Sequence, residues 1–160
     1  MQLTPRMAAR ATELQAAIPT VVYTSGRRTL QAQAHAMAVN TVMNRNFIRL
    51  TYLHAAELQT LVDTHPDATD VLSLQTLLAD AMSQLSTDDL NRISRHLTGD
   101  AVDLLPMEDA NSQPTDVGNQ VIAWIQACPD TDKLLLREAG LVKWHWQTKS
   151  PDNSTTSANV

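Results

Sequence analysis

The sequence predicts an α+β fold, a helix-rich single domain with a small antiparallel sheet. Segments with apolar residues at helical spacing predict the helices, and short runs of β-branched and aromatic residues predict the strands. A chain of 160 residues with 43% hydrophobic and 18% charged residues is typical of one globular domain rather than of a disordered chain. We expect the domain to cover residues 1–147 and the polar tail 148–160 to be disordered.

The helices are predicted from their caps and their periodicity. Thr4 is a good N-cap, Pro5 suits a first helical turn, and Pro19 ends the first helix. Ser86 or Thr87 is a suitable cap for a short helix later in the chain. The expected helices are 4–17, 29–45, 55–64, 69–85, a short one after 86, and 119–128.

The strands are predicted from short apolar runs that end at turn residues. "TVVYT" over 20–24 precedes a Ser-Gly turn, and Gly99 turns the chain into a strand over 101–105, which Pro106 ends. "DKLLLRE" and "VKWHWQT", joined by "AGL", are typical of a β-hairpin. "SQPTDVG", between the strand over 101–105 and the last helix, is expected to be a loop.

Composition excludes several classes of function. The net charge is −5 and no dense Lys/Arg face is visible, which argues against nucleic-acid binding. Cys128 is the single cysteine, so an internal disulfide and a Cys-rich zinc finger are excluded. No apolar run approaches the ~20 residues of a membrane span. The first residues lack the pattern of a secretory signal, so we expect synthesis in the cytoplasm.

Three polar elements, "TSGRR", "SRHLTGDAVD" and "KWHWQ", lie on or beside the predicted sheet. Catalytic zinc takes about three protein ligands and keeps one open position, and imidazole and carboxylate suit it. A Gly-containing turn can bring His96 and Asp103 to one point, and His145 can supply a third ligand from a neighbouring strand. Each residue also has an alternative without metal. His96 can be a solvated turn histidine, Asp103 a sheet-edge carboxylate and His145 a core histidine.

The residues Ser94-x-His96-x-x-Gly99-x-Ala101-x-Asp103 resemble the SxHxxGxAxD motif of the zinc D-Ala-D-Ala peptidases. That superfamily includes the lysostaphin-type and hedgehog-type domains and the phage L-alanyl-D-glutamate endolysins. All five key positions of this specific motif are present. The resemblance implies that His96 and Asp103 bind Zn²⁺.

Two weaker elements follow the family's order along most of the chain. "KWHWQ" is similar to the family's last metal-binding strand, so the resemblance implies that His145 is the third zinc ligand. "SGRR" is similar to the family's SGxR element, whose arginine binds a substrate carboxylate or carbonyl. Arg28 matches that arginine, and Arg27 is the alternative.

The chain departs from the family's pattern at two positions. Three residues before His145, where the family usually has its acidic general base, stands Val142. Glu138, at the end of the preceding predicted strand, is the nearest acid and our candidate base. Glu108 and Asp109 are the alternative acids. Lys143 replaces the first histidine of the HxH strand found in many relatives, and it is a candidate for oxyanion stabilisation.

The resemblance implies a zinc peptidase that hydrolyses a stem-peptide or cross-link amide bond of bacterial peptidoglycan, with an endopeptidase favoured over a carboxypeptidase. Without a signal peptide, such an enzyme would reach the cell wall after phage lysis or through a secretion apparatus or delivery partner. The alternatives are a catalytically inactive zinc domain that binds peptidoglycan or a protein, and a helical adaptor without metal.

Overall fold

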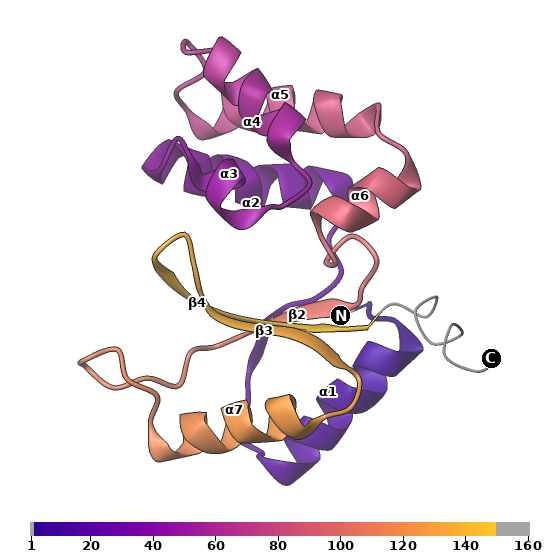
Figure 1. Ribbon diagram of the computed structural model, residues 1–160, viewed down its shortest axis with the longest axis vertical. Coiled ribbons are helices and arrows are strands. Elements are labelled where there is room, and N and C mark those ends of the chain that lie inside the picture. Colours follow the sequence, from indigo (N-terminus) through magenta and orange to yellow (C-terminus); the bar gives the residue numbers. More distant parts are fainter. Residues whose placement is uncertain (1, 150–160) are drawn as a thin grey trace, which may run out of the picture. The chain divides into compact units, whose positions relative to one another are not determined.

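The computed structural model describes residues 2–149 and has the predicted α+β class. The chain divides into two compact units, described separately below. One unit combines the residues up to Arg27 with those from Gly99 onward, and the other spans Arg28–Thr98. Figure 1 shows the elements of both. The predicted helices are all present, and the strands form one antiparallel sheet.

The sheet of the first unit has the strand order β1-β2-β4-β3, with every neighbouring pair antiparallel. The predicted hairpin is confirmed, and its two-residue turn places Ala139 at φ 48° and Gly140 at φ 83°, as a type I′ turn requires. The first strand begins three residues later than expected. The bounds are β1 (Tyr23–Ser25), β2 (Ala101–Leu104), β3 (Thr131–Glu138) and β4 (Leu141–Thr148).

Two helices, α1 (Pro5–Ala17) and α7 (Asp116–Ala127), cover one face of this sheet (Figure 1). Thr4 caps α1 as predicted, and its hydroxyl accepts a hydrogen bond from the Met7 amide. The prediction for the last helix was wrong at its start, because residues 116–118 form its first turn rather than a loop. Thr115 is the N-cap and accepts from the Gly118 amide.

The core of the first unit lies between the two helices and the sheet. Trp144, Trp146 and Val102 are fully buried there, and Leu104 is buried as well. Because side chains alternate along a strand, His145 and Asp103 lie on the opposite face of the sheet. The alternation therefore separates a packed apolar face from a face that carries the predicted ligands.

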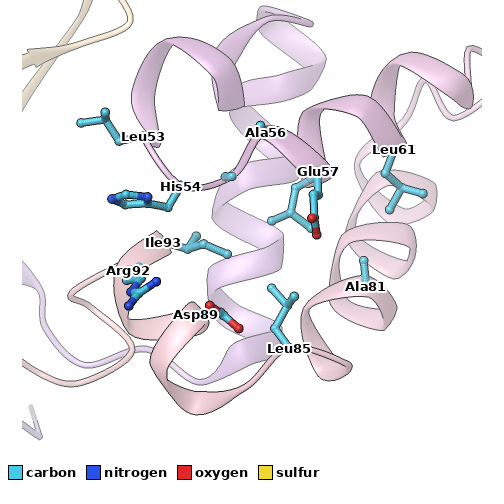
Figure 2. A pocket seen from close by; sticks show the side chains of 12 residues that line it. Leu53, His54, Ala56, Glu57, Leu61, Ala81, Leu85, Asp89, Arg92 and Ile93 are labelled. Atoms are coloured by element: carbon cyan, nitrogen blue, oxygen red, sulfur yellow. The ribbon is translucent and has the colours of Figure 1, made fainter.

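The second unit consists of helices and has its own buried apolar residues. The closest packing between its helices is that of α2 against α5. A helix near 47–51 was not predicted, because five residues are too few to establish a period. This unit contains a pocket of about 580 Å³ with leucines on its walls and Glu57, Asp89 and Arg92 among its polar side chains (Figure 2). The helices are α2 (Leu30–Met43), α3 (Phe47–Thr51), α4 (Ala56–Thr64), α5 (Val71–Ser83) and α6 (Thr87–Ile93).

Strand β4 continues to Thr148, whose amide donates to the carbonyl of Asp100 at 2.9 Å. The greater part of the tail predicted to be disordered, 150–160, lies outside the described residues. Across 2–149, no helix is long and apolar enough to span a bilayer. The predicted domain range of 1–147 stays a prediction.

Candidate metal centre

A row of three polar residues crosses the sheet on the face away from α1 and α7. Ser25 pairs with Asp103 in the register of β1 and β2, and Asp103 pairs with His145 in the register of β2 and β4. Residues directly opposite one another in an antiparallel pair have their side chains on the same face. The strand pairing alone therefore brings Asp103 and His145 together, although they are 42 residues apart in sequence.

His96 lies in the turn that follows α6 and leads into β2. Its ring nitrogens, a carboxylate oxygen of Asp103 and the ring nitrogens of His145 supply three ligand atoms within 4.8 Å of one another. The three residues are buried, with exposed fractions of 3%, 5% and 7%. The turn depends on Gly99, which has φ +87° and whose carbonyl accepts from the Thr4 amide.

The donor set fits a metal ion. Metal–ligand bonds of about 2 Å place any two ligand atoms at most about 4 Å apart, so small side-chain adjustments would bring this group to bonding distance. Two imidazoles and one carboxylate suit zinc and related divalent ions. Burying such polar groups is costly unless they are paired or bind a metal. The structure thus contains a buried His-Asp-His group that could hold a metal ion.

Each oxygen of Asp103 has its own neighbour. The Ser25 hydroxyl donates to Oδ2 at 2.5 Å, and Oδ1 lies 3.1 Å from Nδ1 of His145. A carboxylate that is hydrogen-bonded through one oxygen keeps the other in a defined direction. Ser25, which the sequence suggested only as part of the SGRR element, therefore orients a predicted ligand.

Glu138 lies beside this group. Its Oε1 is 4.0 Å from Nδ1 of His145, and its Oε2 is 3.1 Å from the Lys143 ammonium. A register irregularity explains this position, because two steps along β3, from Leu135 to Arg137, oppose three steps along β4. The irregularity shifts the side-chain alternation, so that Glu138 reaches the face that carries His145. Its side chain is 9% exposed.

Arg28 is tied to the turn of His96 through the main chain. Its backbone amide donates to the His96 carbonyl at 2.9 Å, and its guanidinium donates to Oε1 of Gln33 at 3.2 Å. Arg28, the predicted substrate-binding arginine, thus adjoins the turn that carries the first predicted ligand.

The other candidate acids have structural partners. Glu108 accepts hydrogen bonds from the guanidinium of Arg137 and from the Trp144 indole. These hydrogen bonds, mainly the one from Arg137, hold the pKa of Glu108 below its usual value. Asp109 accepts from the amides of its own loop. Val142 pairs with Arg137 in the register of β3 and β4 and is 45% exposed. None of these arrangements includes a residue of the His-Asp-His group.

Two residues next to the group were not predicted. Oε1 of Gln147 lies 3.3 Å from Nε2 of His145, and the Gln147 amide donates to Oδ2 of Asp132 at 2.6 Å. The only sequence signal for Gln147 is its position two residues after His145 on the same strand, which places both side chains on one face.

In comparisons with known proteins, no family model, no curated protein and no solved structure matched this chain.

Proposed function

We propose that this protein is a zinc-dependent peptidase that hydrolyses an amide bond in the stem peptides or cross-links of bacterial peptidoglycan, acting as an endopeptidase. The observation that carries the proposal is the buried group of His96, Asp103 and His145, with their ligand atoms within 4.8 Å. A buried carboxylate next to this group, Glu138, supports hydrolysis over metal storage. The substrate class rests on the resemblance of the SxHxxGxAxD and SGxR elements.

His96, Asp103 and His145 would hold the zinc ion and leave a position open for water. The chemistry that zinc supplies when bound is a water with a pKa of about 7 and a polarised scissile carbonyl. Glu138 would accept the proton of that water and return it to the leaving amine. The position of Glu138 beside the group, with Oε1 4.0 Å from Nδ1 of His145, supports this role.

Two cations are assigned to the substrate and to the charge that develops on it. Lys143 lies 3.1 Å from Glu138 on the face of β4 that carries His145, where an ammonium would stabilise a developing oxyanion. Arg28 would bind a stem-peptide carboxylate, for which a guanidinium has matching geometry. Its backbone hydrogen bond to His96 couples this substrate-binding residue to the metal-binding turn.

The test is a digest of purified peptidoglycan in the presence of zinc or of a chelator, with mass spectrometry of the released fragments. We expect fragments only with the metal, and their new termini would identify the bond. Glu138→Gln should abolish release while zinc still binds. Glu13→Gln is the matched control, because Glu13 is an exposed residue that pairs with Arg10 on α1, and it should leave release unchanged.

An inactive zinc domain that binds peptidoglycan gives a different result. Such a domain would release no fragments from several peptidoglycan types, although it was folded and loaded with zinc, and Glu138→Gln would leave sedimentation with the cell wall unchanged. Val142 at the usual position of the acid is the observation that favours it. An active enzyme would act on the cell wall after phage lysis or after export by a delivery partner.

A further inference from the structure

We propose that Gln147, oriented by Asp132, fixes the imidazole of His145 so that Nδ1 is the atom that binds the metal. The inference rests on the metal site of the proposed function, but not on its substrate or on its catalytic base. It assigns a positioning role to two residues outside the predicted ligand set, and it concerns the unit that contains the sheet.

The orientation of the Gln147 amide follows from its partner. The amide group lies 2.6 Å from the Asp132 carboxylate, and an ionised carboxylate only accepts hydrogen bonds. The nitrogen of the amide must therefore face Asp132, since its oxygen there would oppose another acceptor. The oxygen of Gln147 is thereby directed at Nε2 of His145, at 3.3 Å.

An oxygen that faces Nε2 determines which ring nitrogen carries the proton. The Gln147 oxygen is an acceptor, so Nε2 of His145 must be a donor and carry hydrogen. In the neutral ring that carries hydrogen on Nε2, Nδ1 is the nitrogen that can coordinate a metal. Nδ1 is also the nitrogen that faces Asp103 Oδ1 at 3.1 Å and Glu138 Oε1 at 4.0 Å. We therefore expect a metal ion held between these two carboxylates to bind His145 through Nδ1.

The backbone explains how Asp132 reaches Gln147. Thr131 pairs with Thr148 and Lys133 pairs with Gln147, so two steps along β3 oppose one step along β4. Asp132 is the additional residue of this irregularity, and bulges of this kind redirect a side chain next to functional sites. The hairpin therefore has two irregularities: the one near Arg137 brings Glu138 to His145, and the one at Asp132 supports the far side of the same ring.

The first experiment identifies the coordinating atom without measuring activity. The full chain, with isotope-labelled histidine, is loaded with NMR-active cadmium as a zinc substitute. We expect a one-bond coupling between the metal and Nδ1 of His145, together with a slowly exchanging proton on Nε2. A coupling to Nε2 would overturn the inference, because Gln147 would then face the wrong nitrogen.

The second experiment measures zinc affinity of variants by competition with a chelating dye. Gln147→Leu removes the acceptor, and we expect zinc to bind about 10- to 100-fold more weakly, as is typical when a partner of a metal-bound histidine is lost. Asp132→Asn frees the amide of Gln147 to rotate and should weaken binding by a smaller factor. This exposed change also tests the inference if Gln147→Leu does not fold.

Asp130→Asn is the matched control. It replaces the same acid by the same amide two residues away, but Asp130 pairs with Arg10. It should bind zinc as the unaltered chain does. If all three variants bound zinc with the affinity of the unaltered chain, the positioning role would be contradicted. If the unaltered chain binds neither zinc nor cadmium, the metal site itself is wrong and the proposed function fails with it. Coupling to Nε2 in a zinc-binding chain rejects only the role of Gln147.

Discussion

At the scale of single residues, Asp103 is the proposed ligand whose charge can be tested apart from its shape. We expect Asp103→Asn to keep the Ser25 hydrogen bond and the sheet register, since asparagine retains an oxygen acceptor. The neutral amide is a poor zinc ligand, so zinc affinity should fall by about 100-fold or more. Isothermal titration with zinc measures the loss. Asp109→Asn, at a carboxylate that accepts from the Asn111 and Gln113 amides of its own loop, is the control and should bind normally.

A change at Ser25 tests how much the hydrogen bond to Asp103 contributes to zinc affinity. Its hydroxyl donates to Asp103 at 2.5 Å, and partners of ligating groups typically contribute about 10- to 100-fold to metal affinity. We expect Ser25→Ala to weaken zinc binding by about 10-fold, the lower end of that range, and to leave the fold intact by circular dichroism. Ser25→Thr, which keeps the hydroxyl, should restore part of the affinity. Unchanged binding by Ser25→Ala would show that the sheet alone holds Asp103.

At the scale of elements, two glycines with positive φ allow the turn before β2 to be compared with the hairpin turn. A β-carbon on Gly99 would lie 3.2 Å from the Thr4 amide nitrogen, whereas one on Gly140 would meet nothing within 4 Å. Gly140→Ala should therefore lower the free energy of unfolding by roughly 1 kcal/mol, the conformational cost alone. Gly99→Ala adds a backbone clash and should cost more. Urea unfolding of both variants measures the difference, and equal losses would contradict a close approach at Gly99.

The elements also show what the sequence could predict. The ligand set was predicted from the polar residue types on the predicted strands and from the resemblance of residues 94–103 and of the KWHWQ strand to a zinc-peptidase motif. Strand alternation explains why His145 lies on the face opposite to Trp144 and Trp146. The positions of Glu138 and Asp132 depend on register irregularities between β3 and β4, and no local signal specifies them. The first turn of α7 was missed because residues 116–118 resemble a loop, and only the Thr115 cap defines the start.

At the scale of the whole molecule, acid should weaken the fold through Glu108. Its folded-state pKa is lowered, mainly by Arg137 and then by Trp144, so it contributes stability above its unfolded pKa of about 4.3. That contribution is lost as the pH falls through the folded-state pKa. We expect Glu108→Gln to be less stable than the unaltered chain at neutral pH, with the difference shrinking as the solution is acidified below about pH 4.3. Urea unfolding at several pH values tests this, and a difference independent of pH would contradict it.

Metal binding should be visible in the stability of the whole chain, since an ion that binds only the folded state raises the free energy of unfolding. At a free zinc concentration of about 100 times the Kd, the gain is about 2.7 kcal/mol. For a chain of 160 residues this corresponds to a rise in Tm of roughly 5–10 °C. The ligands come from distant parts of the sequence, so an unfolded chain cannot present the same group.

We therefore expect zinc to raise the Tm in differential scanning calorimetry and a chelator to reverse the shift. His145→Ala should show no rise with zinc, whereas His65→Ala should respond as the unaltered chain does, because His65 caps α4 and is not part of the ligand group. Equal shifts for His145→Ala and the unaltered chain would mean that zinc stabilises the protein at another place. Because this measurement needs no substrate, it tests the metal centre separately from the peptidase activity proposed for it.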